Sequence, residues 1–216
     1  MLLIFDCDGV LVDSEPLACQ VDADVLGALG LPYTAEEITR QFVGKSMKDM
    51  IARIEADHAC TLPADLTERI NRTLFARFET DLKPIAGVRD AILALPYPRC
   101  VASSSVPERI ALSLRVTGLA DLFENVFSAT MVTRGKPAPD LFLLAAERMG
   151  AKREDCIVIE DSPAGVQAAI AAGMPVIGFT GGGHCGPGHA ESLRQAGAPV
   201  VIEQMTDLSG AVQALA

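Results

Sequence analysis

Short apolar runs alternate with longer amphipathic segments along most of the chain. The runs have the length and the branched side chains that are typical of fully buried parallel strands. They are Leu2–Phe5, Arg99–Ala102, Cys156–Ile159, Pro175–Phe179 and Pro199–Ile202. The segments between them have the hydrophobic spacing of helices. Such alternation of strand and helix predicts an α/β fold, a doubly wound parallel sheet of the Rossmann-like type.

Several of the predicted helices carry recognisable start signals. Ser105 and Glu108 have the spacing of a capping box, which predicts that Ser105 caps the helix that follows. Ser162 and Pro163 offer an N-cap followed by proline at the first helical position. A third helix is expected over residues 140–149.

The interval between the first and second strands breaks this rhythm, because nearly all of it has helical periodicity. Four helical segments fall there: Pro16–Leu29, a segment opened by the capping box of Thr34 and Glu37, Ser46–His58 and Ala64–Phe78. A structureless connection of this length is implausible in a compact domain. We therefore expect an inserted helical subdomain over residues 15–81, with residues 1–14 and 82–216 forming the α/β core.

Composition and charge exclude several classes of protein. Half of the 216 residues are hydrophobic, which rules out intrinsic disorder. The formal net charge of −10 repels nucleic-acid phosphates and anionic lipid, so we expect neither as a partner. The six cysteines show no metal-ligand spacing, and no apolar run approaches the ~20 residues of a membrane span. We expect a cytoplasmic monomer with reduced cysteines.

Residues with reactive side chains cluster where the predicted strands end. Ligands of open parallel sheets bind at the carboxyl ends of the strands, so side chains at those ends indicate function. Four carboxylates and a hydroxyl lie at three strand ends, and one lysine lies in a proline-rich loop. They are Asp6, Asp8, Glu160, Asp161, Ser103 and Lys136.

Such a cluster of carboxylates must protonate, move apart or bind a cation. Two carboxylates 4 Å apart repel each other by roughly 4 kcal/mol at an effective dielectric constant near 20. Oxygen ligands in this number suit Mg²⁺, which is commonly shared with a phosphate. Lys136 could neutralise further phosphate oxygens, and Gly9 permits close approach of backbone amides to the anion. The combination predicts a phosphoryl-transfer site with a carboxylate available as nucleophile.

Four segments resemble, in order, the signatures of the haloacid dehalogenase superfamily of phosphohydrolases. Asp6-Cys-Asp-Gly-Val-Leu-Val-Asp-Ser14 resembles the first, Ser103 the second, Lys136 before Pro-Ala-Pro-Asp140 the third, and Glu160-Asp-Ser-Pro-Ala-Gly165 the fourth. The helical insert resembles the small α-helical cap of that superfamily. Within it, the chain is most similar to the β-phosphoglucomutase/phosphogluconate-phosphatase-like group.

The resemblance implies a role for each matching residue. Asp6 would attack the substrate phosphorus and form an aspartyl-phosphate. Asp8 would protonate the leaving oxygen and then activate the hydrolytic water. Ser103 and Lys136 would fix the transferring phosphoryl group, and Ser104 is a further candidate for this contact.

The resemblance also implies Mg²⁺ as the cofactor. Asp6, the backbone carbonyl of Asp8, and Asp161 would hold the ion. Glu160 would help, either directly or through a water molecule.

The resemblance implies a Mg²⁺-dependent phosphatase acting on a small phosphorylated metabolite, a sugar phosphate or a phosphosugar acid such as 6-phosphogluconate. The alternative is a phosphomutase of the β-phosphoglucomutase type. The positions that match the basic residues of that subgroup are Met47 and Val106, both uncharged, which favours the phosphatase. Dehalogenation is disfavoured because that branch lacks the second aspartate. A phosphorylatable receiver domain is disfavoured by the helical insert.

Some assignments have two interpretations. Lys45 could contact the substrate from the insert, or it could be an ordinary exposed lysine. Asp13 and Ser14 are expected to cap the first insert helix rather than touch substrate. The glycine-rich segment that ends at His184 is expected to be a flexible rim loop, with His184 and His189 solvated.

Overall fold

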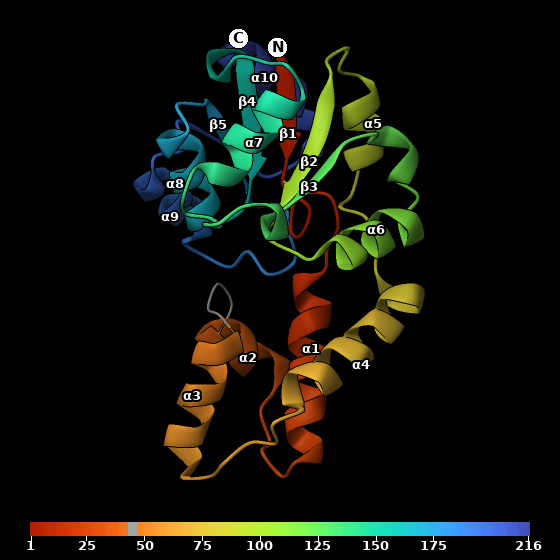
Figure 1. Cartoon of the computed structure of the whole chain (residues 1–216), viewed down its shortest axis with the longest axis vertical. Coiled ribbons are helices and arrows are strands. Elements are labelled where there is room, and N and C mark those ends of the chain that lie inside the picture. Colours follow the sequence, from red (N-terminus) through yellow and green to blue (C-terminus); the bar gives the residue numbers. More distant parts are fainter. Residues whose placement is uncertain (43–46) are drawn as a thin grey trace. The chain divides into compact units, whose positions relative to one another are not determined.

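The computed structural model describes residues 1–42 and 47–216 of the protein (Figure 1). The chain divides into two compact units. The core unit comprises residues 1–13 and 82–216, and the helical unit comprises residues 14–81. The sequence analysis places these boundaries after residues 14 and 81, so the first differs by one residue and the second coincides.

The core unit is built on a parallel sheet of six strands. The strands are β1 (Leu2–Phe5), β2 (Arg99–Ser103), β3 (Val126–Ser128), β4 (Cys156–Glu160), β5 (Val176–Phe179) and β6 (Val200–Ile202). Their order is β3-β2-β1-β4-β5-β6, and every neighbouring pair is parallel. The predicted doubly wound α/β fold is confirmed, with β1 at the point where the strand order reverses.

The sequence missed β3 because this strand has only three residues and lies at the edge of the sheet. Such a short run carries too little periodicity to be told from a loop. Two predicted strands also start one residue later than expected, at Val176 and Val200. In both cases the residue left out is a proline, which has no N–H to donate to a neighbouring strand.

Six helices surround the sheet of the core unit. They are α5 (Val88–Leu93), α6 (Pro107–Val116), α7 (Asp140–Arg148), α8 (Pro163–Ala171), α9 (His189–Ala196) and α10 (Leu208–Leu215). Residues of α7 and α8, such as Phe142 and Val166, are fully buried together with Ile4 and Val158 of the central strands. This apolar layer fixes β1 and β4 side by side, so their carboxyl ends share one edge of the sheet.

Short 3₁₀ turns complete the core unit. They are Ala120–Leu122, Ala129–Met131, Arg153–Asp155 and Met205–Asp207. The predicted cap of α8 is confirmed, because the Gly165 amide donates to the Ser162 hydroxyl over 3.0 Å. The predicted helix over residues 140–149 matches α7 to within one residue.

The helical unit contains α1 (Glu15–Ala28), α2 (Ala35–Phe42), α3 (Met47–His58) and α4 (Leu66–Asp81). The capping box of α2 is confirmed, because the Glu37 amide donates to the Thr34 hydroxyl and the Thr34 amide to the Glu37 carboxylate. Among the residues that the structure describes, no helix has the length and apolar character needed to cross a membrane.

Candidate active site

Three carboxylates meet at the carboxyl edge of the sheet. Asp6 directly follows β1, Glu160 ends β4, and Asp161 comes next. The Asp6 amide donates to the Ile159 carbonyl over 3.0 Å, which extends the pairing of the two strands to their ends. One carboxylate oxygen from each of the three acids lies within 4.8 Å of the others, and all three residues are buried. The sequence-predicted carboxylates of β1 and β4 are therefore brought together.

Lys136 lies inside this carboxylate group. Its ammonium donates to Asp6 Oδ1 and to Glu160 Oε1, both over 2.6 Å, and to the Ala102 carbonyl over 3.1 Å. The side chain is only 5% exposed. A lysine in a proline-rich loop thus becomes the cation at the centre of the group.

Burial dominates the electrostatics of the cluster. It raises the pKa of the Asp6 carboxyl well above its ordinary value, opposed by Lys136 and reinforced by the neighbouring carboxylates. Burial likewise raises the pKa of Asp161, opposed by a hydrogen bond from His184. Burial disfavours the charged form of Lys136 as well, yet the Asp6 and Glu160 carboxylates together raise its pKa above the ordinary lysine value. One ammonium therefore balances only part of the negative charge.

These residues fit a hard divalent cation. Asp6, Glu160 and Asp161 offer oxygen atoms only, close enough to share one ion. Oxygen ligands of this kind suit Mg²⁺, which keeps several waters in addition. A divalent cation would also offset the burial and the repulsion that together raise the pKa values of Asp6 and Asp161.

Glu160 also has contacts within the core unit. Its Oε2 accepts hydrogen bonds from the Ser162 amide and hydroxyl, at 2.8 and 2.9 Å, while its Oε1 accepts from Lys136. A Cβ on Gly165 would lie 1.8 Å from Glu160 Oε1, so the fourth signature needs glycine there. Glu160 therefore orients Lys136 and the start of α8, whether or not it also touches a metal ion.

Asp8 is held by two residues that follow β2. Its Oδ2 accepts a hydrogen bond from the Ser105 hydroxyl over 2.7 Å, and its Oδ1 pairs with Arg109 Nη2 over 2.9 Å. The side chains of Asp8 and Arg109 are 15% and 20% exposed. Both oxygens of the second aspartate are thus positioned by neighbours within the core unit.

The predicted capping role of Ser105 is wrong. The N-cap of α6 is Val106, with no side-chain cap bond, because the Ser105 hydroxyl is turned toward Asp8 instead. Arg109 was missed altogether. The available signal was its place in the first turn of a helix that starts at the carboxyl edge of the sheet.

The other predicted phosphate contacts lie at the same edge. Ser103 ends β2, is 1% exposed and accepts a hydrogen bond from the Ser105 amide over 3.1 Å. Ser104 is exposed. Gly9 has φ +80°, and a Cβ there would lie 1.8 Å from Asp161 Oδ2. The Gly9 amide donates to the Val12 carbonyl. Glycine is required at this position because any side chain would collide with Asp161.

The glycine-rich segment after β5 is a loop, as predicted, but its two histidines are not exposed to solvent as expected. The His184 side chain is only 5% exposed, and its Nε2 lies 3.1 Å from Asp161 Oδ2. Burial by itself would lower the pKa of His184. The hydrogen bond with Asp161 opposes this effect, and the pKa of His184 is raised to about 10. His189 Nε2 contacts the backbone carbonyl of Asp161 over 2.6 Å.

The expectation that Asp13 and Ser14 cap α1 is confirmed only for the position of Ser14. Ser14 occupies the N-cap position but makes no side-chain cap bond. The Asp13 carboxylate instead accepts a hydrogen bond from the Gly183 amide over 2.8 Å, which anchors the glycine-rich segment. Lys45 lies outside the residues that the structure describes.

Comparison with known proteins decides the family. Residues 1–173 match the family model of the haloacid dehalogenase-like hydrolases. The chain belongs to this family. It is 32% identical over 187 residues to the 6-phosphogluconate phosphatase of Escherichia coli (strain K12), covering 86% of this chain and 85% of that protein. It is also 33% identical over 177 residues to the fructose-1-phosphate phosphatase of the same organism, covering 81% and 94%. The resemblance found in the sequence is thus confirmed.

Solved structures agree with this assignment. A conserved haloacid dehalogenase-like protein of unknown function from Agrobacterium tumefaciens superposes with a TM-score of 0.91 at 41% identity, covering 99% of this chain and 98% of that one. A haloacid dehalogenase family hydrolase from Deinococcus radiodurans, with bound phosphate and sodium, superposes with a TM-score of 0.84 at 34% identity, covering 99% and 95%.

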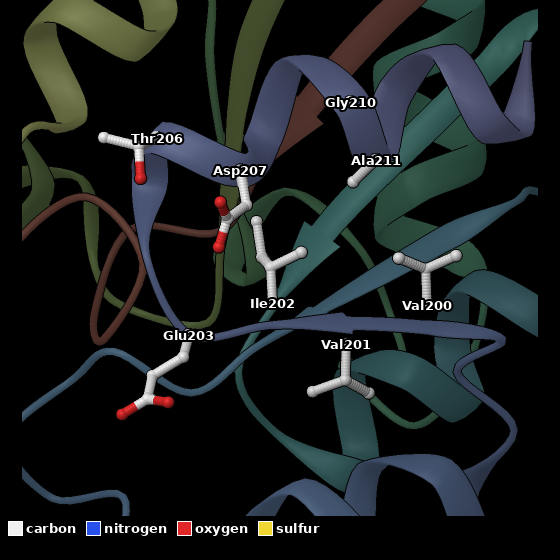
Figure 2. A pocket seen from close by; sticks show the side chains of 8 residues that line it. All are labelled: Val200, Val201, Ile202, Glu203, Thr206, Asp207, Gly210 and Ala211. Atoms are coloured by element: carbon white, nitrogen blue, oxygen red, sulfur yellow. The ribbon is translucent and has the colours of Figure 1, made fainter.

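A pocket elsewhere on this hydrolase lies along the outermost strand (Figure 2). It is lined by residues of β6 and by the segment that leads into α10, among them Glu203 and Asp207. None of the predicted site residues lines it. Its two acidic side chains and lack of lysine or arginine make it unsuited to a phosphorylated ligand.

Mg²⁺ should stabilise the hydrolase more at pH 8 than at pH 5. Because the folded-state pKa values of Asp6 and Asp161 are raised, these groups hold protons to higher pH than in the unfolded chain. As pH rises above the pKa that these carboxyls have in the unfolded chain, their ionisation destabilises the metal-free fold. Mg²⁺ binding, in contrast, requires the ionised forms. A ligand present at a concentration of 100 times its Kd adds about 2.7 kcal/mol to the free energy of unfolding.

Thermal unfolding with and without Mg²⁺ at the two pH values measures this effect. Asp161→Asn should remove most of the Mg²⁺-induced rise in Tm. A rise of equal size at both pH values, or a larger one at pH 5, would contradict the assignment of the cluster as the cation site.

Lys136→Met should destabilise the metal-free protein by about 3–5 kcal/mol, the usual cost of removing one partner of a buried ion pair. The variant keeps an unbranched apolar stem, one atom shorter than lysine, but leaves Asp6 and Glu160 without their shared cation. The loss should be greater at pH 8 than at pH 5, because the raised pKa of Asp6 favours its protonation at lower pH, which relieves the repulsion.

Urea unfolding provides the free energies. Lys152→Met is the matched control, because Lys152 is exposed near the opposite end of β4 and should change stability by less than about 0.5 kcal/mol. Equal stability of Lys136→Met and wild type would mean that Lys136 does not balance the carboxylate charge.

Proposed function

We propose that the protein is a Mg²⁺-dependent phosphatase of small phosphorylated metabolites, acting through an aspartyl-phosphate on Asp6. The observation that carries the proposal is the burial of Asp6 beside Glu160, Asp161 and Lys136 at the carboxyl edge of the sheet. A surplus of buried carboxylates with one ammonium among them is costly unless a cation neutralises it, and a cation held there can also bind the phosphate of a substrate.

In the first step, an Asp6 carboxylate oxygen attacks the substrate phosphorus and the bond from phosphorus to the ester oxygen breaks. Asp8 gives its proton to that oxygen, so the product leaves as an alcohol. Ser105 and Arg109 orient the Asp8 carboxyl for this transfer. Lys136 and Ser103 hold the transferring phosphoryl oxygens.

In the second step, Asp8 takes a proton from water while the water oxygen bonds to phosphorus. The bond between phosphorus and Asp6 breaks, which releases inorganic phosphate and returns both aspartates to their starting states. Asp6, Asp161 and the Asp8 carbonyl, with Glu160 nearby, would hold a Mg²⁺ ion, which would supply positive charge to stabilise the phosphoryl oxygens.

We infer that the substrate is a phosphorylated sugar or sugar acid. Two relatives are named for 6-phosphogluconate and fructose 1-phosphate, which share a phosphate ester on a polyhydroxylated chain. The core residues recognise only the phosphate and the ion. The helical unit, residues 14–81, is therefore assigned the role of a cap that selects the rest of the substrate, with Lys45 as a candidate contact.

Turnover of p-nitrophenyl phosphate with Mg²⁺ tests the activity, and a panel of phosphorylated metabolites tests the substrate class. The panel should include 6-phosphogluconate, fructose 1-phosphate and both anomers of glucose 1-phosphate. The account predicts sustained phosphate release that EDTA abolishes. Stoichiometric labelling without turnover would contradict it, and isomerisation of glucose 1-phosphate without phosphate release would indicate a mutase.

A further inference from the structure

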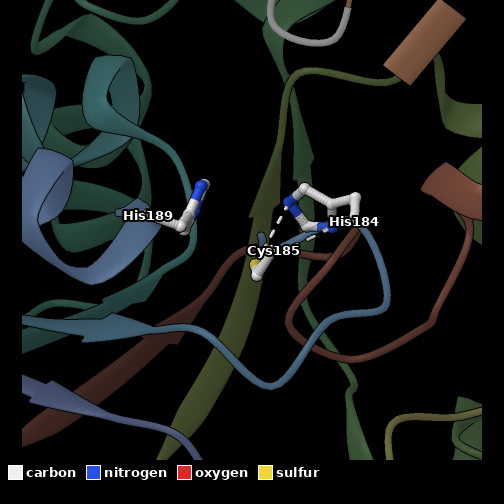
Figure 3. Close-up of side chains that lie close together, drawn as sticks. All are labelled: His184, Cys185 and His189. Atoms are coloured by element: carbon white, nitrogen blue, oxygen red, sulfur yellow. Dashed lines mark hydrogen bonds between the residues drawn. The ribbon is translucent and has the colours of Figure 1, made fainter. Parts of the chain in front are cut away.

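A group of softer ligands lies beside the carboxylate cluster. His184 and Cys185 end the glycine-rich segment after β5, and His189 begins α9 (Figure 3). Cys185 lies between the two histidines in this view. One ligand atom from each residue lies within 4.8 Å of the others, and the three residues are half-buried, with the His184 side chain only 5% exposed. Neither the family signatures nor the proposed phosphatase mechanism uses them.

The separations within this group are close to the edges of a tetrahedral metal site. Bonds of about 2.3 Å to sulfur and about 2.0–2.1 Å to nitrogen place two tetrahedral ligands about 3.5 Å apart. Cys185 Sγ lies 4.0 Å from His184 Nδ1 and 3.5 Å from His184 Nε2. The separation to Nδ1 is about 0.5 Å longer than this edge, so a small side-chain rotation brings the thiol and Nδ1 to the spacing of two ligands of one ion.

Both histidines also have the outer contacts that metal-binding histidines use. Such a histidine usually donates from its second ring nitrogen to a carbonyl or carboxylate, which fixes the ring. His189 Nε2 is 2.6 Å from the Asp161 carbonyl oxygen, and His184 Nε2 is 3.1 Å from Asp161 Oδ2. These contacts leave the Nδ1 atom of each ring to face an ion.

The glycines around His184 leave room for its ring. A Cβ on Gly182 would lie 2.9 Å from His184 Cε1, and a Cβ on Gly9 would lie equally close to the same atom. The Gly183 amide is held by Asp13 over 2.8 Å. The segment is therefore shaped to keep His184 in place rather than being free in solvent.

We propose that His184, Cys185 and His189 form a second metal site, which binds a Zn²⁺-class ion separately from the carboxylate site. One thiolate and two imidazoles are ligands for zinc and related transition metals, whereas Mg²⁺ prefers oxygen. Three protein ligands leave the fourth tetrahedral position to water or another exchangeable ligand.

An ion in this site would hold Asp161 in position through the two histidines, which are not part of the carboxylate cluster. Its two histidine ligands contact the carboxylate and the carbonyl of Asp161. The second site would thereby act as a positioning device for a proposed Mg²⁺ ligand. The binding of the ion itself does not depend on the phosphatase activity.

Titration of the full-length, reduced protein with Co²⁺ in excess Mg²⁺ tests the proposal directly. Cobalt reports its own ligands, because a bound thiolate gives a charge-transfer absorption band that oxygen ligands do not. Wild type should bind one equivalent with this band, and Zn²⁺ should displace it. Cys185→Ser should lose the band, while Cys60→Ser, which changes another partly exposed thiol, should keep it.

His189→Gln is a second variant that tests the site even if Cys185→Ser does not fold. It keeps the thiol but removes one imidazole, and should weaken Co²⁺ binding by more than about 100-fold, the upper end of the effect of an outer-shell change. Absence of the thiolate band in wild type would overturn the proposal. An undiminished band in Cys185→Ser, or unchanged affinity in His189→Gln, would also overturn it.

Discussion

Asp6→Asn is expected to lower kcat by about 10⁴-fold or more, because loss of a covalent nucleophile removes the step on which turnover depends. The amide is nearly the same size as the carboxyl, so the variant should fold. It should even gain stability without Mg²⁺, because burial raises the pKa of Asp6 and so penalises its charged form. An increase in Tm together with loss of turnover separates the catalytic role from a structural one.

Steady-state hydrolysis of p-nitrophenyl phosphate and thermal unfolding provide the two measurements. Asp155→Asn is the matched control, because Asp155 is exposed just before β4 begins, at the opposite end of the strand from Glu160. It should leave both quantities unchanged. Activity of Asp6→Asn near the wild-type level would eliminate Asp6 as the nucleophile.

Asp8→Ala is expected to slow the hydrolysis of alkyl phosphates by about 10²–10⁴-fold, the usual contribution of a positioned acid. The loss should be much smaller for p-nitrophenyl phosphate at the first step, because its phenolate leaves without a proton. Ser105 and Arg109 hold the two oxygens of Asp8, so the acid is oriented before substrate arrives.

Single-turnover rates on a sugar phosphate and on p-nitrophenyl phosphate distinguish this role. Ser105→Ala provides a milder companion, because it removes one contact of Asp8 but keeps the carboxyl. Ser105→Ala should also slow the hydrolysis of the sugar phosphate more than that of p-nitrophenyl phosphate, but the loss of rate should be smaller than in Asp8→Ala. Equal losses on both substrates in Asp8→Ala would count against the role of general acid.

The residues that the sequence predicts well are those whose position follows from the sheet. Asp6 and Glu160 come at the ends of two strongly apolar runs, and parallel pairing forces such ends to one edge. Lys136 was predicted as a phosphate contact, and the structure places it between these two carboxylates. Its exact partners depend on the folded loop and not on any local pattern.

The errors arise where a local rule competes with a distant partner. Ser105 has the spacing of a capping box, but its hydroxyl donates to Asp8, which is 97 positions away in the sequence. Arg109 and His184 likewise acquire their roles from partners in other segments. Residue spacing along one chain carries no information about such contacts. The cysteine spacing similarly gave no sign that Cys185 would meet two histidines.

The stereochemical course at phosphorus tests the central claim most directly. A substrate carrying a chiral isotopic thiophosphoryl group can be hydrolysed in isotopic water, and the configuration of the released thiophosphate determined. Transfer to Asp6 and then to water is two in-line displacements, so the account predicts net retention. Net inversion would mean that water attacks the substrate directly, which would contradict an aspartyl-phosphate on Asp6.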